Sequence, residues 1–209
     1  MGQVALQILA SSVQSLKIFA LTLIFSLPLG FVVAAGKMSR FKVISIPVSI
    51  FIIIMRGTPL ILQLIFVYFA PFYVLGFSFP RFTACIVAFV LNYSAYFAEI
   101  YRGGLQSLDI GQHEACYVLG LSRGAEFFYV KLPQVVRIVF PSVGNEVVTL
   151  VKDTALAQTI GIAELFRTAQ TASARMFSVM PIFIAGIFYF VMNAMVSKAF
   201  DYFEKRMSY

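Results

Sequence analysis

Long apolar runs separated by short polar segments cover most of the chain, and their lengths predict helices that cross a membrane. A helix needs about 20 apolar residues to cross the hydrocarbon of a bilayer. On that basis we expect about five membrane-spanning helices, at residues 13–36, 43–75, 82–102, 132–151 and 176–197. The sequence therefore predicts an all-α, polytopic membrane protein with a single transmembrane domain over residues 1–209.

The second of these runs, 43–75, is interrupted near its middle. The polar segment 56–59 reads Arg-Gly-Thr-Pro and separates two apolar halves. We interpret the run as one long, broken span, although a simple proline kink would give the same pattern. Broken helices expose backbone groups and often mark transport sites, because unpaired backbone is tolerated at membrane depth only inside protein or beside water.

Two other runs leave alternatives open. Residues 1–16 place apolar side chains at helical spacing with Gln and Ser between them. This pattern suits either a short helix on the membrane surface or the outer end of the first span. The fourth span is the weakest of the set because it contains Arg137 and Glu146.

The composition supports the bilayer as the solvent of this chain. Sixty per cent of the residues are hydrophobic and 12% are charged, against about 25% charged in an average soluble domain. The net charge of +7 comes from basic residues that lie between the apolar runs. We therefore attribute it to membrane topology and predict contact with membrane lipid and no binding of nucleic acid.

The distribution of Lys and Arg predicts which end of each span faces the cytoplasm. With the N-terminus outside, ten of the sixteen basic residues fall in the inner segments and five in the outer ones, with Arg56 in the membrane. Positive charge concentrates on the cytoplasmic side of membrane proteins. We therefore expect the N-terminus outside and the C-terminus in the cytoplasm.

The segment 103–131 is the longest polar stretch and falls on the cytoplasmic side of this topology. Residues 114–119 favour a short helix, and Gly120 can provide the left-handed residue that ends it. Pro133 suits the first turn of the fourth span. On these grounds alone the segment is either an ordinary interfacial helix or a docking surface for another protein.

Several functional classes lack their motifs in this sequence. We find no Gly-rich loop for nucleotide phosphates, no clustered partners for His113 that would form a metal site, and no nucleophile motif. We therefore predict a non-enzymatic chain without catalytic residues, cofactor or metal. If it performs active transport, the energy must come from an ion gradient or from another subunit.

Polar residues at membrane depth are the candidates for a substrate path. Charged groups are costly in hydrocarbon and usually face the protein interior or a water-filled cavity. Each of them could instead form ion pairs or hydrogen bonds between helices, or lie at the interface. The candidates are Arg56, Thr58, Asn92, Tyr96, Glu99, Glu146 and Asp153.

The segment 103–131 also carries a resemblance to a known family. It is similar to the Glu-Ala-Ala…Gly…Ile-x-Leu-Pro motif of binding-protein-dependent ATP-binding cassette (ABC) importer permeases, with Cys and Val as small replacements. The matching residues are Glu114-Ala115-Cys116, Gly120 and Val130-Lys131-Leu132-Pro133.

Further segments, spread over roughly residues 10–205, resemble the polar amino acid branch of that family, which includes histidine, glutamine, glutamate, arginine and cystine systems. They include 56–60 (RGTPL), 92–99 (NYSAYFAE), 102–104 (RGG) and 152–156 (KDTAL). Ala155 departs from the Ser of many relatives. The resemblance implies a type I ABC importer permease fold in the bacterial cytoplasmic membrane.

The resemblance also implies partners. A cytoplasmic ATPase dimer would bind ATP and Mg²⁺, an extracytoplasmic binding protein would deliver a polar amino acid, and a second permease chain, identical or related, would complete the pore. Leu119 would pin the loop against the permease. The residues expected to form the ATPase docking and coupling loop are Gln112, Glu114, Ala115, Cys116, Leu119, Gly120, Leu121 and Arg123.

A rival prediction from another class is a secondary transporter or channel that works alone. Secondary transporters often show internal repeats and more spans than about five, and no repeat is visible here. The two predictions differ in whether the chain needs an ATPase to move its substrate.

Overall fold

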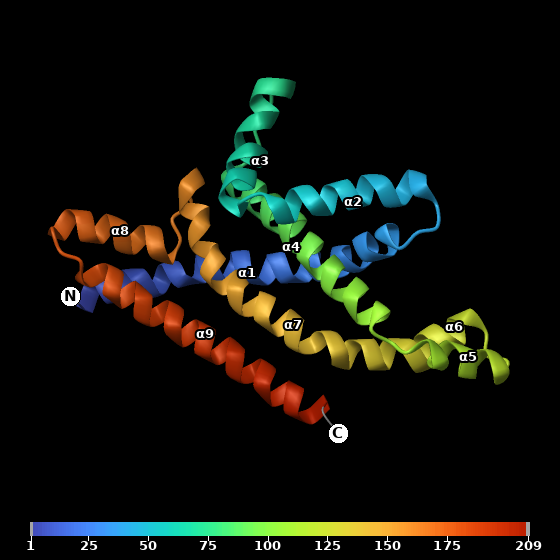
Figure 1. Cartoon of the computed structure of the whole chain (residues 1–209). Coiled ribbons are helices and arrows are strands. Elements are labelled where there is room, and N and C mark those ends of the chain that lie inside the picture. Colours follow the sequence, from blue (N-terminus) through green and yellow to red (C-terminus); the bar gives the residue numbers. More distant parts are fainter. Residues whose placement is uncertain (1, 208–209) are drawn as a thin grey trace.

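The structure is a computed structural model that describes residues 2–207, and within that range the chain is helical with no strand. Figure 1 shows the arrangement of the helices. The elements are α1 Gly2–Lys37, α2 Lys42–Gly57, α3 Leu60–Leu75, α4 Arg81–Gln106, α5 Ile110–Val118, α6 Arg123–Ala125, the π-helix η1 Glu126–Lys131, α7 Leu132–Asp153, the 3₁₀-helix η2 Thr154–Ile160, α8 Leu165–Met176 and α9 Met180–Met207.

Four of the described helices are long and apolar enough to cross a membrane: α1, α4, the continuous helix 123–160 and α9. The pair α2 and α3 passes the same test as a unit, which gives up to five candidate spans. The all-α membrane fold predicted from the apolar runs is confirmed. The two halves of the broken run differ in direction by 113°, far more than a simple proline kink produces.

Several element boundaries differ from the prediction. Residues 2–16 continue α1 without a break, so they form one end of the first long helix and no separate surface helix. The predicted last span at 176–197 begins too early, because α8 ends at Met176 and a turn precedes α9. Pro133 lies in the first turn of α7, as predicted. The helix itself is longer than the predicted span, because it runs from α6 at Arg123 through the π-helix η1 into α7.

The core forms where α4 packs between α1 and α7. Phe89, Tyr93 and Phe97 of α4 are at most 2% exposed and pack with Ile18 of α1 and Leu150 of α7. Close approach of α1 depends on Gly30, since a Cβ there would lie 2.8 Å from the Cβ of Phe97. Small residues at helix contacts are typical of packing in membranes, where van der Waals contact drives association.

The outward-facing side chains are largely apolar. On α9, Phe183, Ile187 and Phe190 are each more than 60% exposed, and the last turn of α3 is exposed to a similar degree. Such a surface suits hydrocarbon or a partner helix. Figure 1 places the α5–α6 segment and the loop after α1 at one end of the bundle, and the N-terminus and the α8–α9 turn at the opposite end.

Candidate functional site

Two buried amide side chains, Gln63 and Asn92, form hydrogen bonds with the backbone at the break between α2 and α3. The last carbonyl groups of a helix have no partner within the helix, and the Met55 carbonyl receives hydrogen bonds from Gln63 Nε2 at 2.9 Å and from Asn92 Nδ2 at 3.1 Å. Gln63 also donates to the Thr58 carbonyl and accepts from Asn92 Nδ2 at 2.9 Å. The broken backbone is thereby held inside protein, and Asn92 bonds a neighbouring helix.

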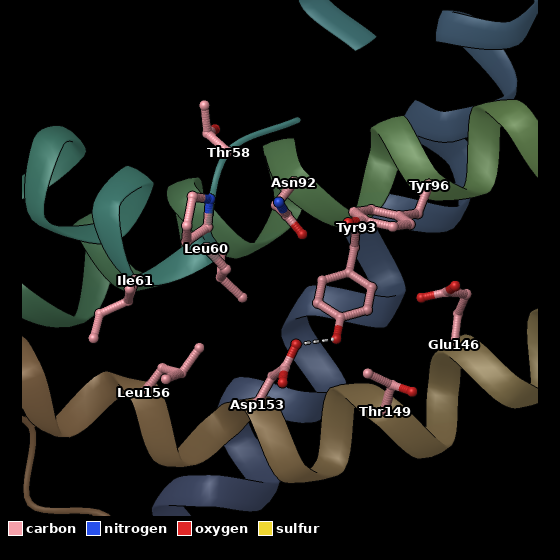
Figure 2. A pocket seen from close by; sticks show the side chains of 11 residues that line it. Thr58, Leu60, Ile61, Asn92, Tyr93, Tyr96, Glu146, Thr149, Asp153 and Leu156 are labelled. Carbon is pink, nitrogen blue, oxygen red and sulfur yellow. Dashed lines mark hydrogen bonds between the residues drawn. The ribbon is translucent and has the colours of Figure 1, made fainter. Parts of the chain in front are cut away.

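A polar cavity of about 410 Å³ lies beside this break, between α3, α4 and α7. Figure 2 shows the side chains that line it. Its volume is at the lower end of ligand pockets, which run from about 300 to 1,000 Å³. The structure brings five of the predicted path residues together there: Thr58, Asn92, Tyr96, Glu146 and Asp153.

Two carboxylates face the cavity from α7 and differ in their partners. Asp153 accepts a hydrogen bond of 2.7 Å from the hydroxyl of Tyr93, which is drawn in Figure 2. Glu146 has no hydrogen bond or ion pair with any residue in the range 2–207. Tyr93 was not among the candidate path residues predicted from the sequence. Its contact with a residue 60 positions away leaves no local signal.

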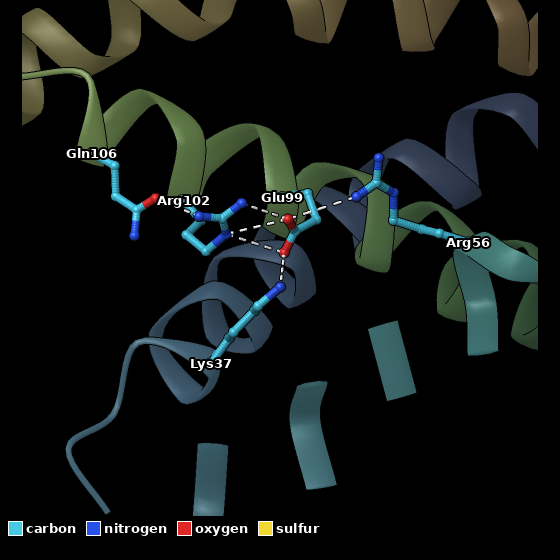
Figure 3. A network of polar contacts seen from close by, with 5 residues as sticks. All are labelled: Lys37, Arg56, Glu99, Arg102 and Gln106. Atoms are coloured by element: carbon cyan, nitrogen blue, oxygen red, sulfur yellow. Dashed lines mark hydrogen bonds and ion pairs between the residues drawn. The ribbon is translucent and has the colours of Figure 1, made fainter. Parts of the chain in front are cut away.

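The other two predicted path residues, Arg56 and Glu99, do not line the cavity and instead belong to an ion cluster next to it (Figure 3). Glu99 is 13% exposed at its side chain and lies 2.5 Å from Lys37 Nζ, 2.7 Å from Arg102 Nη2 and 3.6 Å from Arg56 Nη1. Three helices are therefore joined through one carboxylate. Of the two roles considered for Glu99, substrate contact or interhelical ion pairing, the structure shows ion pairing.

Arg56 connects this cluster to the cavity. Its guanidinium lies 5.3 Å from the centre of the Tyr96 ring, which forms part of the cavity wall. A cation over an aromatic face at this distance is attracted by the ring. Arg56 also sits in the last turn of α2, where the helix dipole favours positive charge.

The predicted coupling loop forms a helical hairpin in which α5 lies against the beginning of the long helix 123–160. Its helix α5 begins four residues earlier than predicted, because Asp109 caps it through a 2.6 Å hydrogen bond to the Gly111 N–H. It ends as predicted at Gly120, whose φ is +69°. The Leu121 N–H then bonds the Cys116 carbonyl at 3.0 Å, the pattern of a glycine helix stop.

A buried carboxylate holds α5 against the rest of the hairpin. Glu126 is 6% exposed, and its Oε1 lies 2.7 Å from His113 Nδ1 and 2.5 Å from Lys131 Nζ. Cys116 packs inward at 4% exposure, and Gln112 accepts a 3.3 Å hydrogen bond from Gln134. The sequence did not single out Glu126, since a lone acid in a polar loop usually faces solvent.

The opposite side of the hairpin is exposed and carries large apolar side chains together with charged ones. Tyr117, Val118 and Leu119 are 81%, 84% and 75% exposed, and Glu114, Ala115 and Arg123 are also exposed. The resemblance implied that Leu119 pins the loop against the permease. Within this chain it does not, because its side chain is exposed. Cys116 makes the inward contact in its place. Among residues 2–207, no three His, Cys, Asp or Glu side chains gather as a metal site would require.

A helical membrane bundle with a broken helix beside a polar cavity is the architecture of a multi-pass membrane transport component. Residues 26–209 match the family described as binding-protein-dependent transport system inner membrane component. The chain therefore belongs to that family and is a permease component of an amino acid ABC importer.

Individual relatives cover nearly the whole chain. The putative glutamine transport system permease protein GlnP of Rickettsia felis is 34% identical over 201 residues, which are 96% of this chain and 92% of the relative. The arginine transport system permease protein ArtQ of Bacillus subtilis is 37% identical over 179 residues, which are 85% and 82% of the two chains.

The fold also has counterparts among solved structures. A crystal structure of an amino acid ABC transporter with histidines matches with a TM-score of 0.89 and 35% identity, covering 96% of this chain and 94% of the other. The inward-facing MetNI methionine ABC transporter matches with a TM-score of 0.73 at 16% identity, covering 97% and 94%, which concerns the fold alone. The predicted type I permease fold is confirmed by the first match.

Proposed function

We propose that this permease moves a polar amino acid inward in a complex with an ATPase, which docks on the α5–α6 hairpin. The observation that carries the proposal is the exposed apolar face of α5 around Tyr117, Val118 and Leu119. A face of this kind, on a hairpin anchored through Glu126, suits a partner surface that pulls or pushes on the long helix 123–160. ATP and Mg²⁺ belong to the partner in this proposal.

The remaining parts of the proposal follow from position and charge. The α5–α6 end of the bundle is cytoplasmic, with the N-terminus outside and the C-terminus inside, in keeping with the bias of Lys and Arg. An extracytoplasmic binding protein delivers the amino acid at the opposite end. A second permease chain covers part of the bare apolar surface of α3 and α9.

The cavity beside Asn92 is the substrate site of this proposal. It joins a helix break, two carboxylates and an aromatic wall within one amino-acid-sized space, and a few converging polar groups in a cavity are the usual form of a ligand site. The Glu99 cluster holds α1, α2 and α4 together next to the site and does not itself line it.

Reconstitution in liposomes tests the coupling directly. We expect uptake of amino acid only when the permease is combined with its ATPase, its binding protein and ATP. Uptake by this chain alone, driven by an ion gradient, would show that it is a secondary transporter and would refute the proposal.

A charge reversal on the hairpin tests the docking surface. Glu114 is exposed on α5, so Glu114→Lys should leave membrane insertion intact while it weakens ATPase association and transport by roughly tenfold or more. Asp201→Lys is the matched control, because Asp201 is an exposed acid on α9 outside the hairpin. Equal coupling in the two variants would remove Glu114 from the docking surface.

A further inference from the structure

Most side-chain hydrogen-bond donors at the cavity are already used, whereas carboxylate and amide oxygens remain available as acceptors. The Asn92 amide spends its Nδ2 group on Met55 and Gln63, so the atom left to face the cavity is its oxygen (Figure 2). The Tyr93 hydroxyl donates to Asp153. The side chains that remain for a ligand are therefore rich in oxygen acceptors, and they suit a ligand that is rich in N–H donors.

The two carboxylates lie on one face of α7 and are spaced along it. Glu146 and Asp153 are seven residues apart, which is two helical turns and about 10 Å along the axis. Both side chains point into the same cavity in Figure 2. Two negative groups at that spacing fit a ligand with positive charge at two separated positions.

The Glu146 carboxylate has no partner of its own. Among residues 2–207 it accepts no hydrogen bond and forms no ion pair, whereas Asp153 is held by Tyr93. An unpaired carboxylate that is half-buried is costly unless a cation meets it. Arg56 exerts an electrostatic effect on Glu146, but its contacts are with Glu99 and Tyr96.

The third charge of an amino acid, its α-carboxylate, also has a place in the cavity. The start of α3 lines the same space through Pro59, Leu60 and Ile61. The first N–H groups of a helix lack partners within the helix, and its N-terminus carries partial positive charge. An α-carboxylate at this end would leave the α-ammonium and the side chain to face α7.

We infer that this cavity selects an amino acid with a cationic side chain, of the arginine, lysine or ornithine class, over neutral and acidic ones. The inference rests on the proposed function of the cavity as the substrate site. Asp153, which lies beside the start of α3 in Figure 2, meets the α-ammonium group, and Glu146 meets the side-chain cation. An amino acid with a neutral side chain would leave one carboxylate unpaired, and one with an acidic side chain would be repelled. Both effects weaken the binding of the wrong ligands and so add to the selectivity for a cationic one.

The test measures binding to the permease–ATPase complex in lipid nanodiscs without the binding protein, whose own selectivity would otherwise intervene. Radiolabelled arginine and radiolabelled glutamine are each titrated, and unlabelled lysine and glutamate serve as competitors. We expect arginine and lysine to bind at least tenfold more tightly than glutamine. Glutamine binding as tightly as arginine would overturn the inference.

A variant that removes the charge of Glu146 tests whether this residue causes the selectivity. Glu146→Gln should weaken arginine binding by roughly ten- to a hundredfold and leave glutamine binding within about twofold, because the amide keeps the shape and loses the charge. Asp201→Asn, an exposed acid outside the cavity, should change neither. Thermal unfolding and ATPase association verify that Glu146→Gln is folded. Unchanged arginine binding in that variant would overturn the inference.

The outcomes separate this inference from the proposed function. Glutamine binding as tightly as arginine to the permease–ATPase complex, together with ATP-driven amino acid uptake by the complete transporter, would refute the cationic selectivity and leave the importer function standing. Absence of ATP-driven uptake for every amino acid would refute the proposed function, and the inference would fall with it.

Discussion

Gln63 shows how a single side chain can make a broken helix tolerable inside a membrane protein. It is 8% exposed and satisfies backbone carbonyls of Met55 and Thr58 at the end of α2 while it also contacts Asn92. Without such partners these carbonyl groups would be unpaired at membrane depth, which costs several kcal/mol per group in hydrocarbon. Gln63 therefore fixes the position of the cavity wall at Thr58.

Replacing this amide should expose its role. Gln63→Leu keeps the bulk but leaves the acceptors at Met55 and Thr58 with fewer partners, so we expect a loss of about 1–3 kcal/mol in stability. Thermal unfolding in detergent measures it. Gln170→Leu, an exposed glutamine on α8, is the control. Equal unfolding temperatures for the two variants would contradict this account.

Glu164 is a second buried polar residue with a structural role, at the start of α8. It is 0% exposed, its carboxylate caps α8 through the N–H groups of Phe166 and Arg167 at 2.7 and 2.6 Å, and it accepts from Tyr189 at 3.0 Å and Ser15 at 3.5 Å. Burial raises the pKa of this carboxyl, and the capping hydrogen bonds oppose the rise without cancelling it.

The direction of that shift predicts a pH dependence. A carboxyl with a higher pKa in the folded protein binds more protons there than in the unfolded chain, so its contribution to stability falls as pH rises from the ordinary value of 4.5 through the raised one. The unfolding temperature of the wild type relative to Glu164→Gln should therefore decrease across that interval. A difference that is constant with pH would contradict the expected shift.

At the scale of helices, the crossing of α4 and α7 depends on Gly104. A Cβ at this position would lie 2.2 Å from Cγ1 of Val139 and 3.3 Å from Cγ1 of Val135. The two helices carry the cavity residues Asn92 and Asp153, so their separation sets the width of the site. Overpacking a tight contact of this kind typically costs about 1–3 kcal/mol.

The adjacent glycine provides a matched comparison for this crossing. Gly104→Ala should destabilise the protein by about 1–3 kcal/mol, whereas Gly103→Ala, with open space around it, should be neutral or stabilise the helix by up to about 1 kcal/mol. Thermal unfolding distinguishes them, and Val139→Ala added to Gly104→Ala should restore part of the loss. Equal effects of the two alanines would show that the contact is not tight.

The elements that the sequence could predict are those encoded locally. Apolar runs predict the long helices, and Gly120 predicts where α5 ends, because both signals lie within a few residues of their effect. The 113° turn between α2 and α3 was not predictable, since it depends on Asn92 and Gln63, 29 residues apart. The contact of Tyr93 with Asp153 is equally non-local.

In the candidate site too, the sequence could predict which residues are candidates but not which of them meet. Five of the polar residues that were predicted because polar groups are costly in a membrane do meet in one cavity. Arg56 and Glu99 instead belong to an ion cluster beside it, in which Glu99 lies closer to Lys37 and Arg102 than to Arg56. From sequence, both outcomes look alike, because a charge at membrane depth needs a partner whether that partner is a ligand or another side chain. Only the arrangement of α1, α2 and α4 distinguishes them.

For the whole molecule, the two ends of the bundle should face opposite sides of the membrane. The bias of Lys and Arg toward the end with the α5–α6 hairpin predicts that this end is cytoplasmic. Single cysteines test this. Met38→Cys lies in the loop after α1 and Val179→Cys in the α8–α9 turn, at exposed positions of opposite ends.

Labelling of right-side-out membrane vesicles with an impermeant maleimide should then modify only one of them. Val179→Cys should react in intact vesicles, and Met38→Cys should react only after permeabilisation. The native Cys85 and Cys116 are buried and should contribute little, which the unaltered chain verifies as a control. Reaction of Met38→Cys in intact vesicles would reverse the topology, and the α5–α6 hairpin would then be on the wrong side of the membrane for a cytoplasmic ATPase.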